Sequence, residues 1–138
     1  MKKVLFTLVV LLVAVQFINA QCMKTGCVIS VHMIQLEPNE GYDIPNLINF
    51  LEKELYPAFA KELNCEIKLT KGLNRENKNN LGVIYYYTSK KQFNTFWNED
   101  GSPTEKGQKA IDNINSLRIE FRERGSSTTP IVQDWIIK

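Results

Sequence analysis

Alternating apolar and polar positions mark four segments of the chain as β-strands. Successive side chains of a strand point to opposite faces of a sheet, so a period of two predicts a strand with two distinct faces. The segments are CVISVHMIQLE from Cys27, Cys65 to Lys71, Leu81 to Thr88, and the closing stretch TTPIVQDWIIK. In the first strand Ile29, Val31 and Met33 share one face, and the other holds Val28, Ser30, His32, Ile34 and Leu36.

Between these strands, apolar residues recur at three- and four-residue spacing, which is the period of a helix buried on one side. One such helix follows Asp43 as N-cap, and we expect Pro57 to kink it or to split off its last turn at Tyr56. Two capping boxes predict the starts of further helices, one at Ser89 and one at Ser102 with Pro103 in the first helical position. Gly125 is the expected stop of the last helix.

The predicted order is therefore strand, helix, strand, strand, helices, strand. The polar segment GLNRENKNNLG, residues 72–82, joins the second and third strands as a long hairpin loop. This order predicts an α+β fold, a ferredoxin-like βαββαβ antiparallel sheet with helices on one face.

The first twenty residues have the layout of a secretory signal peptide. Lys2 and Lys3 precede an apolar run from Val4 to Val15, and the small Ala20 stands at the expected cleavage site. That run is shorter than the roughly 20 residues that a helix needs to span a bilayer. We expect a signal peptide over residues 1–20, a single domain over 21–138, and a mature protein that is secreted or periplasmic and has no transmembrane segment.

Removing the signal peptide balances the charge of the chain. The full sequence has 17 Lys and Arg against 15 Asp and Glu, and the two lysines of the signal account for the difference. A domain with balanced and interspersed charges lacks the basic surface that phosphate backbones attract. We therefore expect no nucleic-acid partner.

The three cysteines, Cys22, Cys27 and Cys65, lie in the part of the chain that would be exported, where disulfides are permitted. Three arrangements stay open: a Cys27 to Cys65 disulfide with a lipid on Cys22, a Cys22 to Cys27 bridge, or reduced buried cysteines. Gln21 stands where a bacterial lipobox has Gly or Ala, so a lipoprotein is less favoured. The spacing Cys-x4-Cys with a single histidine matches no zinc framework, and we expect no metal.

The third predicted strand has no polar face. Val83, Tyr85 and Tyr87 lie on one side, and Ile84 and Tyr86 lie on the other. Because helices cover only one face of such a sheet, apolar residues on the second face predict that a partner covers it. The simplest partner is a second copy of the chain, so we expect a homodimer.

The element order, the closing strand TTPIVQDWIIK and the block KGLNRENKNNLGVIYYYTSKKQFNTFWNEDGSPTEKG resemble the dimeric α/β-barrel superfamily. This group includes antibiotic-biosynthesis-monooxygenase-like domains, stress-responsive domains and exported bacterial proteins of that fold. The resemblance covers about residues 27–137 and lies in layout more than in motifs. It implies a homodimer in which two sheets face one another and enclose a cavity. Members include cofactor-free oxygenases, cyclases, haem-handling enzymes and proteins without known activity, so the fold does not select a function.

His32 is the only histidine and therefore the only candidate for histidine-dependent catalysis. We expect it to lie with Ser30 on the face away from the helices, where it would line the barrel cavity and suit a general base. An imidazole that simply hydrogen-bonds a neighbour explains the same residue. Tyr85 and Tyr86 complete the candidate ligand-binding set, and the pocket is expected around whichever of them shares the side of His32.

Signatures of a phosphate-binding loop, a serine nucleophile elbow and a metal-binding histidine pair are missing from the sequence. We therefore expect an exported, non-catalytic dimer that binds a small apolar or aromatic ligand, or acts as an interaction module, without a cofactor. The alternative is a cofactor-independent monooxygenase- or cyclase-like enzyme with His32 as general base. A cavity position within hydrogen-bond reach of another polar side chain favours the enzyme, whereas exposure or burial among aliphatic residues excludes it.

Overall fold

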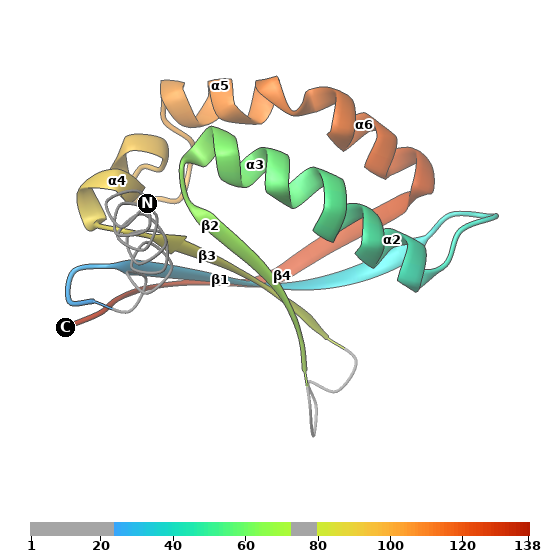
Figure 1. Cartoon of the computed structure of the whole chain (residues 1–138), viewed down its shortest axis with the longest axis horizontal. Coiled ribbons are helices and arrows are strands. Elements are labelled where there is room, and N and C mark those ends of the chain that lie inside the picture. The colour runs from blue at the N-terminus through green and yellow to red at the C-terminus, as the bar shows by residue number, and fades with distance from the viewer. Residues whose placement is uncertain (1–23, 73–79) are drawn as a thin grey trace, which may run out of the picture.

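A four-stranded antiparallel sheet with helices over one of its faces forms the fold (Figure 1). The computed structural model describes residues 24–72 and 80–138; the predicted signal peptide, Cys22 and most of the predicted hairpin loop lie outside these ranges. The strands are β1 (Val28–Pro38), β2 (Glu66–Lys71), β3 (Leu81–Tyr87) and β4 (Gly125–Ile136). They lie in the order β2-β3-β1-β4, and each neighbouring pair is antiparallel. This split βαβ arrangement confirms the predicted ferredoxin-like fold class.

The first crossover between strands is a single helix with a π-helical turn in its middle. It consists of α2 (Ile44–Phe50), the π turn η2 (Leu51–Leu55) and α3 (Tyr56–Leu63). The side chain of Asp43 caps it, as predicted, by accepting a hydrogen bond of 2.8 Å from the backbone N–H of Asn46. Pro57 has no N–H to donate and its ring crowds the preceding turn, so the expected disturbance at Tyr56 takes the form of a widened turn.

The π turn also explains the spacing of the buried side chains along this helix. Leu47, Leu51, Leu55, Phe59 and Leu63 stand four residues apart. On a regular α-helix such a series drifts by about 40° at each step, because 3.6 residues complete a turn. The wider π turn takes up this drift, and the four leucines are all buried in one core.

The second crossover contains three helices, α4 (Lys90–Phe96), α5 (Glu105–Asn113) and α6 (Asn115–Arg124). Ser89 caps α4 as predicted, accepting a hydrogen bond of 3.1 Å from the N–H of Gln92. Gly125 follows the last helix, also as predicted, and begins β4.

The predicted helix start at Ser102 is wrong by two residues. Thr104 is the N-cap of α5 and accepts a hydrogen bond of 3.1 Å from the N–H of Gly107. Pro103 lies before the helix, in a bridge with Trp97. The Ser102 hydroxyl instead donates to the carboxylate of Asp100 at 2.6 Å, so the preceding turn uses the group that would have capped the helix.

The helices cover the face of the sheet opposite to the one we expected. The side of β1 that holds Ser30 and His32 faces the helices, together with Val83, Tyr85 and Tyr87 of β3. The prediction that Ser30 and His32 lie away from the helices is therefore wrong. Alternation divides the side chains of a strand into two sets, but it does not say which set a helix covers.

The other side of the sheet, here called the open face, carries mainly apolar residues. The strand register brings its members into one continuous area, which consists of Ile29, Val31, Met33, Ile84, Tyr86, Ile131 and Trp135. Glu66 and Lys68 of β2, which form an ion pair of 2.9 Å, lie beside Tyr86 and Ile84 at its margin. Trp135 is 59% exposed, so the described chain leaves part of this apolar area in contact with solvent.

Cys27 and Cys65 lie on either side of β3, because one precedes β1 and the other precedes β2. Both carry thiols, and that of buried Cys27 donates to the carbonyl oxygen of Thr88 at 3.6 Å. The Cys27 to Cys65 disulfide is therefore not formed, and the arrangements that involve Cys22 fall outside the described residues.

Each helix among the described residues is too short or too polar to span a membrane.

Candidate functional site

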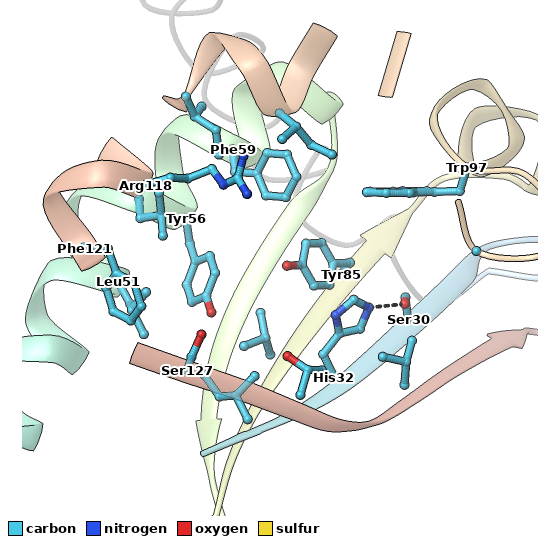
Figure 2. Close-up of a pocket in the computed structure, with 18 of the residues that line it drawn as sticks. Ser30, His32, Leu51, Tyr56, Phe59, Tyr85, Trp97, Arg118, Phe121 and Ser127 are labelled. Atoms are coloured by element: carbon cyan, nitrogen blue, oxygen red, sulfur yellow. Dashed lines mark hydrogen bonds between the residues drawn. The ribbon is translucent and has the colours of Figure 1, made fainter. Parts of the chain in front are cut away.

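A cavity of about 640 Å³ lies between the helices and the covered face of the sheet (Figure 2). Small-molecule sites commonly have volumes of about 300–1,000 Å³ and a mainly apolar lining with a few polar groups. Apolar and aromatic side chains that line the cavity are Ile34, Leu51, Leu55, Tyr56, Phe59, Val83, Tyr85, Tyr87, Phe93, Trp97, Ile111, Ile114, Phe121 and Val132. Further polar side chains come from both sides of it, namely Ser30, His32, Arg118, Arg122, Ser126, Ser127, Thr129 and Asp134.

His32 and Ser30 form the most defined polar contact of the cavity. Two residues apart on β1, they point to the same face, and His32 Nε2 lies 2.9 Å from Ser30 Oγ. Ser30 is only 4% exposed, so its hydroxyl has little access to water as an alternative partner. The imidazole also packs against the ring of Tyr85, with 4.7 Å between the centroids. These contacts fix the orientation of the imidazole.

The second imidazole nitrogen of His32 points away from Ser30 (Figure 2). In the tautomer in which Nε2–H donates to Ser30 Oγ, Nδ1 has a lone pair available to accept a proton. Burial lowers the pKa of His32 below its ordinary 6.5, and the nearby carboxylate of Asp134 opposes this effect. His32 is therefore neutral at pH 7, which is the form a proton acceptor needs.

The tyrosines of the cavity are neutral hydroxyl groups. Burial is the largest of the causes that raise the pKa of Tyr85 and Tyr87, and it alone raises that of Tyr56. The hydroxyl of Tyr87 already accepts a hydrogen bond of 2.8 Å from Trp97 Nε1. Tyr85 and Tyr56 lie between the helices and the sheet (Figure 2). Both can donate a hydrogen bond to an anionic or carbonyl oxygen of a ligand.

The structure brings together three of the four predicted site residues. Ser30, His32 and Tyr85 line one cavity, whereas Tyr86 does not, because its position on β3 places it on the open face opposite Ile29. The condition that would exclude His32 as a base, exposure or purely aliphatic surroundings, is not met. Whether any of these residues binds a ligand stays a prediction.

Sequence reasoning missed Arg118, Tyr56 and Ser127. Arg118 belongs to the series Ile111, Ile114, Arg118 and Phe121, whose three- and four-residue spacing marks the buried side of the last two helices. A charged residue on an apolar stripe is the signal that could have identified it. Tyr56 stands beside the apolar series of the first helix, and Ser127 precedes the alternating part of the last strand, so neither gave a comparable signal.

Within residues 24–72 and 80–138, no three side chains of His, Cys, Asp or Glu are grouped closely enough to hold a metal ion.

No protein-family model matches the sequence, and the search among curated proteins finds no match. Among solved structures, a variant of SnoaB, a cofactor-independent oxygenase from Streptomyces nogalater, is similar with 12% identity and a TM-score of 0.45, over 79% of this chain and 90% of that one. A dimeric protein of unknown function with a ferredoxin-like fold from Bacteroides fragilis is similar with 10% identity and a TM-score of 0.37, over 78% and 95%.

At these identities and TM-scores, neither likeness assigns a function or a site residue to this chain. The chemistry of the cavity therefore has to come from the residues of this chain.

Proposed function

We propose that this protein binds a small, largely apolar or aromatic molecule in the cavity between its helices and its sheet. The observation that carries the proposal is the cavity of about 640 Å³, whose aromatic and aliphatic walls surround a small number of oriented polar groups. Phe59 packs edge-on against Tyr85, with 6.3 Å between ring centroids, so aromatic rings already pack face and edge at the site.

Calorimetric titration of the protein with 2-naphthol, a flat neutral aromatic probe, tests this proposal. Ser127→Trp places a large ring on the β4 side of the cavity and is expected to weaken binding at least tenfold. Ser116→Trp adds the same ring to an exposed position of α6 that does not line the cavity, and should bind as the unmodified protein does. Absence of binding, or equal binding by Ser127→Trp, would contradict the proposal.

A second candidate function is proton transfer by a cofactor-independent enzyme with His32 as general base. The specific observation in its favour is the contact of His32 with Ser30, which leaves Nδ1 as the acceptor in one tautomer. A phenolic O–H or an acidic C–H of the ligand would give its proton to Nδ1. The carboxylate of Asp134 would stabilise the resulting imidazolium, and the hydroxyl of Tyr85 would donate to the anion left on the ligand.

Absorbance of 4-nitrophenol at a fixed pH between 6 and 7 tests this second candidate, because the phenolate and the phenol absorb at different wavelengths. A base in the cavity raises the fraction of phenolate in the bound probe above the fraction in buffer. His32→Gln should abolish that rise while the probe still binds. An unchanged phenolate fraction in His32→Gln would exclude His32 as the acceptor.

We also propose that the protein is a homodimer that associates through the open face. Its apolar members lie side by side on three strands, and ionic residues are found at its margin in β2 rather than at its centre. A two-fold axis would pair this face with its own copy. A monomeric mass in sedimentation equilibrium at micromolar concentration would contradict the proposal.

Export rests on the layout of residues 1–20, and we propose that the mature chain begins at Gln21 in the periplasm or outside the cell. The mass of the protein recovered from the producing cells tests this, because cleavage removes a defined segment. A full-length chain in the cytosol would contradict it.

A further inference from the structure

We propose that the ligand of the cavity is an apolar or aromatic carboxylic acid whose carboxylate is bound by Arg118. This inference rests on the proposed ligand-binding function and adds a chemical class to it. It places the negative group of the ligand beside α6, on the other side of Tyr85 from His32 (Figure 2).

The first observation is the position of the Arg118 guanidinium. Arg118 is half-buried, and its side chain extends from α6 toward Phe59 in the space between the helices and the sheet (Figure 2). The ion pairs among the described residues join Lys68 to Glu66 and Arg124 to Glu120, so no carboxylate of this part of the chain neutralises Arg118. A guanidinium has five N–H donors and cannot lose its charge, so Arg118 brings to the cavity a positive charge that an anion can pair with.

Arg124 on the same helix provides a comparison within the molecule. Its guanidinium forms an ion pair with Glu120 one turn earlier and lies 4.3 Å from the centroid of the Phe50 ring. The charge of Arg124 is therefore satisfied by protein groups, as expected of an arginine that only supports the fold. Arg118 has no such arrangement among the described residues, which favours a ligand as its partner.

Neutral hydroxyl groups add to the anion site. Tyr56 and Ser127 point toward one another below Arg118, one from α3 and one from β4 (Figure 2). Burial raises the pKa of Tyr56, which keeps its hydroxyl protonated as a donor. A guanidinium with neighbouring hydroxyl donors suits a carboxylate, which offers two oxygens in one plane.

The charged side chains of the cavity predict the orientation in which an anionic ligand binds. Asp134 is the carboxylate that lines the cavity, and it lies near His32, where it acts on the pKa of the imidazole. Arg118 lies on the opposite side of Tyr85 (Figure 2). A ligand anion is attracted to the Arg118 side and repelled from the Asp134 side, so the group that meets His32 should be the uncharged end of the ligand.

Two probes of nearly equal shape test this inference in the mature chain by calorimetry. 2-Naphthoate carries a carboxylate, and naphthalene-2-carboxamide replaces it with a neutral amide. Charged hydrogen bonds predict that the carboxylate binds about 10- to 100-fold more tightly. Arg118→Met should remove this preference by weakening carboxylate binding much more than carboxamide binding, whereas Arg118→Lys should retain part of it.

Lys109→Met is the control, because it removes one positive charge from an exposed position of α5 that does not line the cavity. It should keep the full preference for the carboxylate. Equal affinities of the two probes for the unmodified protein would overturn the inference and leave ligand binding itself intact. A preference that survives in Arg118→Met would overturn the role of Arg118. Failure of both probes to bind would overturn the proposed function and the inference together. Circular dichroism of Arg118→Met, with Arg118→Lys as the second variant, separates loss of folding from loss of the anion site.

Discussion

The two faces of the sheet differ in where polar and apolar side chains stand out from their surroundings. The covered face holds Ser30, half-buried His32 and Tyr85 among the apolar side chains beneath the helices, whereas the open face presents Val31 and Trp135 with no helix above them. In a sheet that only supports a fold, the apolar set lies under the helices and the polar set meets water. Oriented polar groups under a helix layer support the proposed ligand site, and apolar groups on the outer side support the proposed dimer interface.

The largest effect should come from placing a charge on the open face. Val31→Lys puts an ammonium group at its centre, between Ile84 and Gln133. An unpaired charge buried in an interface costs about 3–5 kcal/mol. We expect the dimer to dissociate at least a hundredfold more readily, as measured by sedimentation equilibrium.

Ile119→Lys is the matched control for this experiment, because Ile119 is a 47% exposed apolar residue on α6 rather than on the sheet. It should leave the association unchanged. If both variants dissociate equally, the open face is not the interface.

Two neighbouring tyrosines give the next test, since they point to different faces of β3. Tyr87→Phe removes the acceptor of the Trp97 indole N–H, which then lies unsatisfied at the cavity wall. The free energy of unfolding should fall by about 1–2 kcal/mol in urea titration. Tyr86→Phe removes a hydroxyl from the open face and should change it by less than about 0.5 kcal/mol. Equal losses of unfolding free energy would contradict the placement of a hydrogen-bonded hydroxyl on the covered face and an unconstrained one on the open face.

The pH dependence of stability should reveal the half-buried imidazole of His32. Because the pKa of His32 is lowered on folding, the unfolded chain binds more protons than the folded chain once the pH is below 6.5. The free energy of unfolding should therefore decrease as the pH falls from 6.5 through the lowered pKa. Urea titrations between pH 5 and 7 measure this change, and His32→Gln should lack the part that is due to the imidazole. Identical profiles would contradict the lowered pKa of His32.

The smallest effect concerns Asp134, whose carboxylate raises the pKa of His32 against the larger effect of burial. Asp134→Asn removes that charge, so the pKa of His32 should fall further. His32 is the only histidine, which makes its imidazole a single, assignable signal in nuclear magnetic resonance titrations. A pKa that rises in Asp134→Asn would contradict this electrostatic arrangement.

Local patterns predicted most of the fold. Alternation located β1, β2 and β3 to within one residue, because each has side chains of contrasting polarity or a strong content of β-branched and aromatic residues. The start of β4 was predicted three residues late, since its first residues after Gly125 are serines and threonines that do not alternate.

The candidate site was predicted only in part. Two properties of the site, namely which face of the sheet is covered and which helix residues reach the cavity, depend on contacts between segments that are distant in the sequence. The choice of covered face requires the packing of α2 to α6 on the sheet, which is why Ser30 and His32 were assigned to the wrong side. Arg118 becomes a site residue only because α6 places it across the cavity from β1. The position of Arg118 on an apolar stripe was visible in the sequence, but the cavity that its side chain lines was not.

The π turn of Leu51–Leu55 acts as a phase shift between the two halves of the first crossover helix. The i→i+5 hydrogen bonds of this turn fit one more residue into a turn than an α-helix does, so the extra residue hardly changes the direction of the side chains that follow. Deleting one residue from the turn would therefore restore a regular helix and leave Tyr56 and Phe59 directed at the cavity, with Leu47 and Phe50 still in the core. Forcing the same residues into a regular α-helix would instead add a rotation of about 100° and turn Tyr56 and Phe59 away from the cavity. The π turn therefore determines which aromatic side chains a ligand can meet.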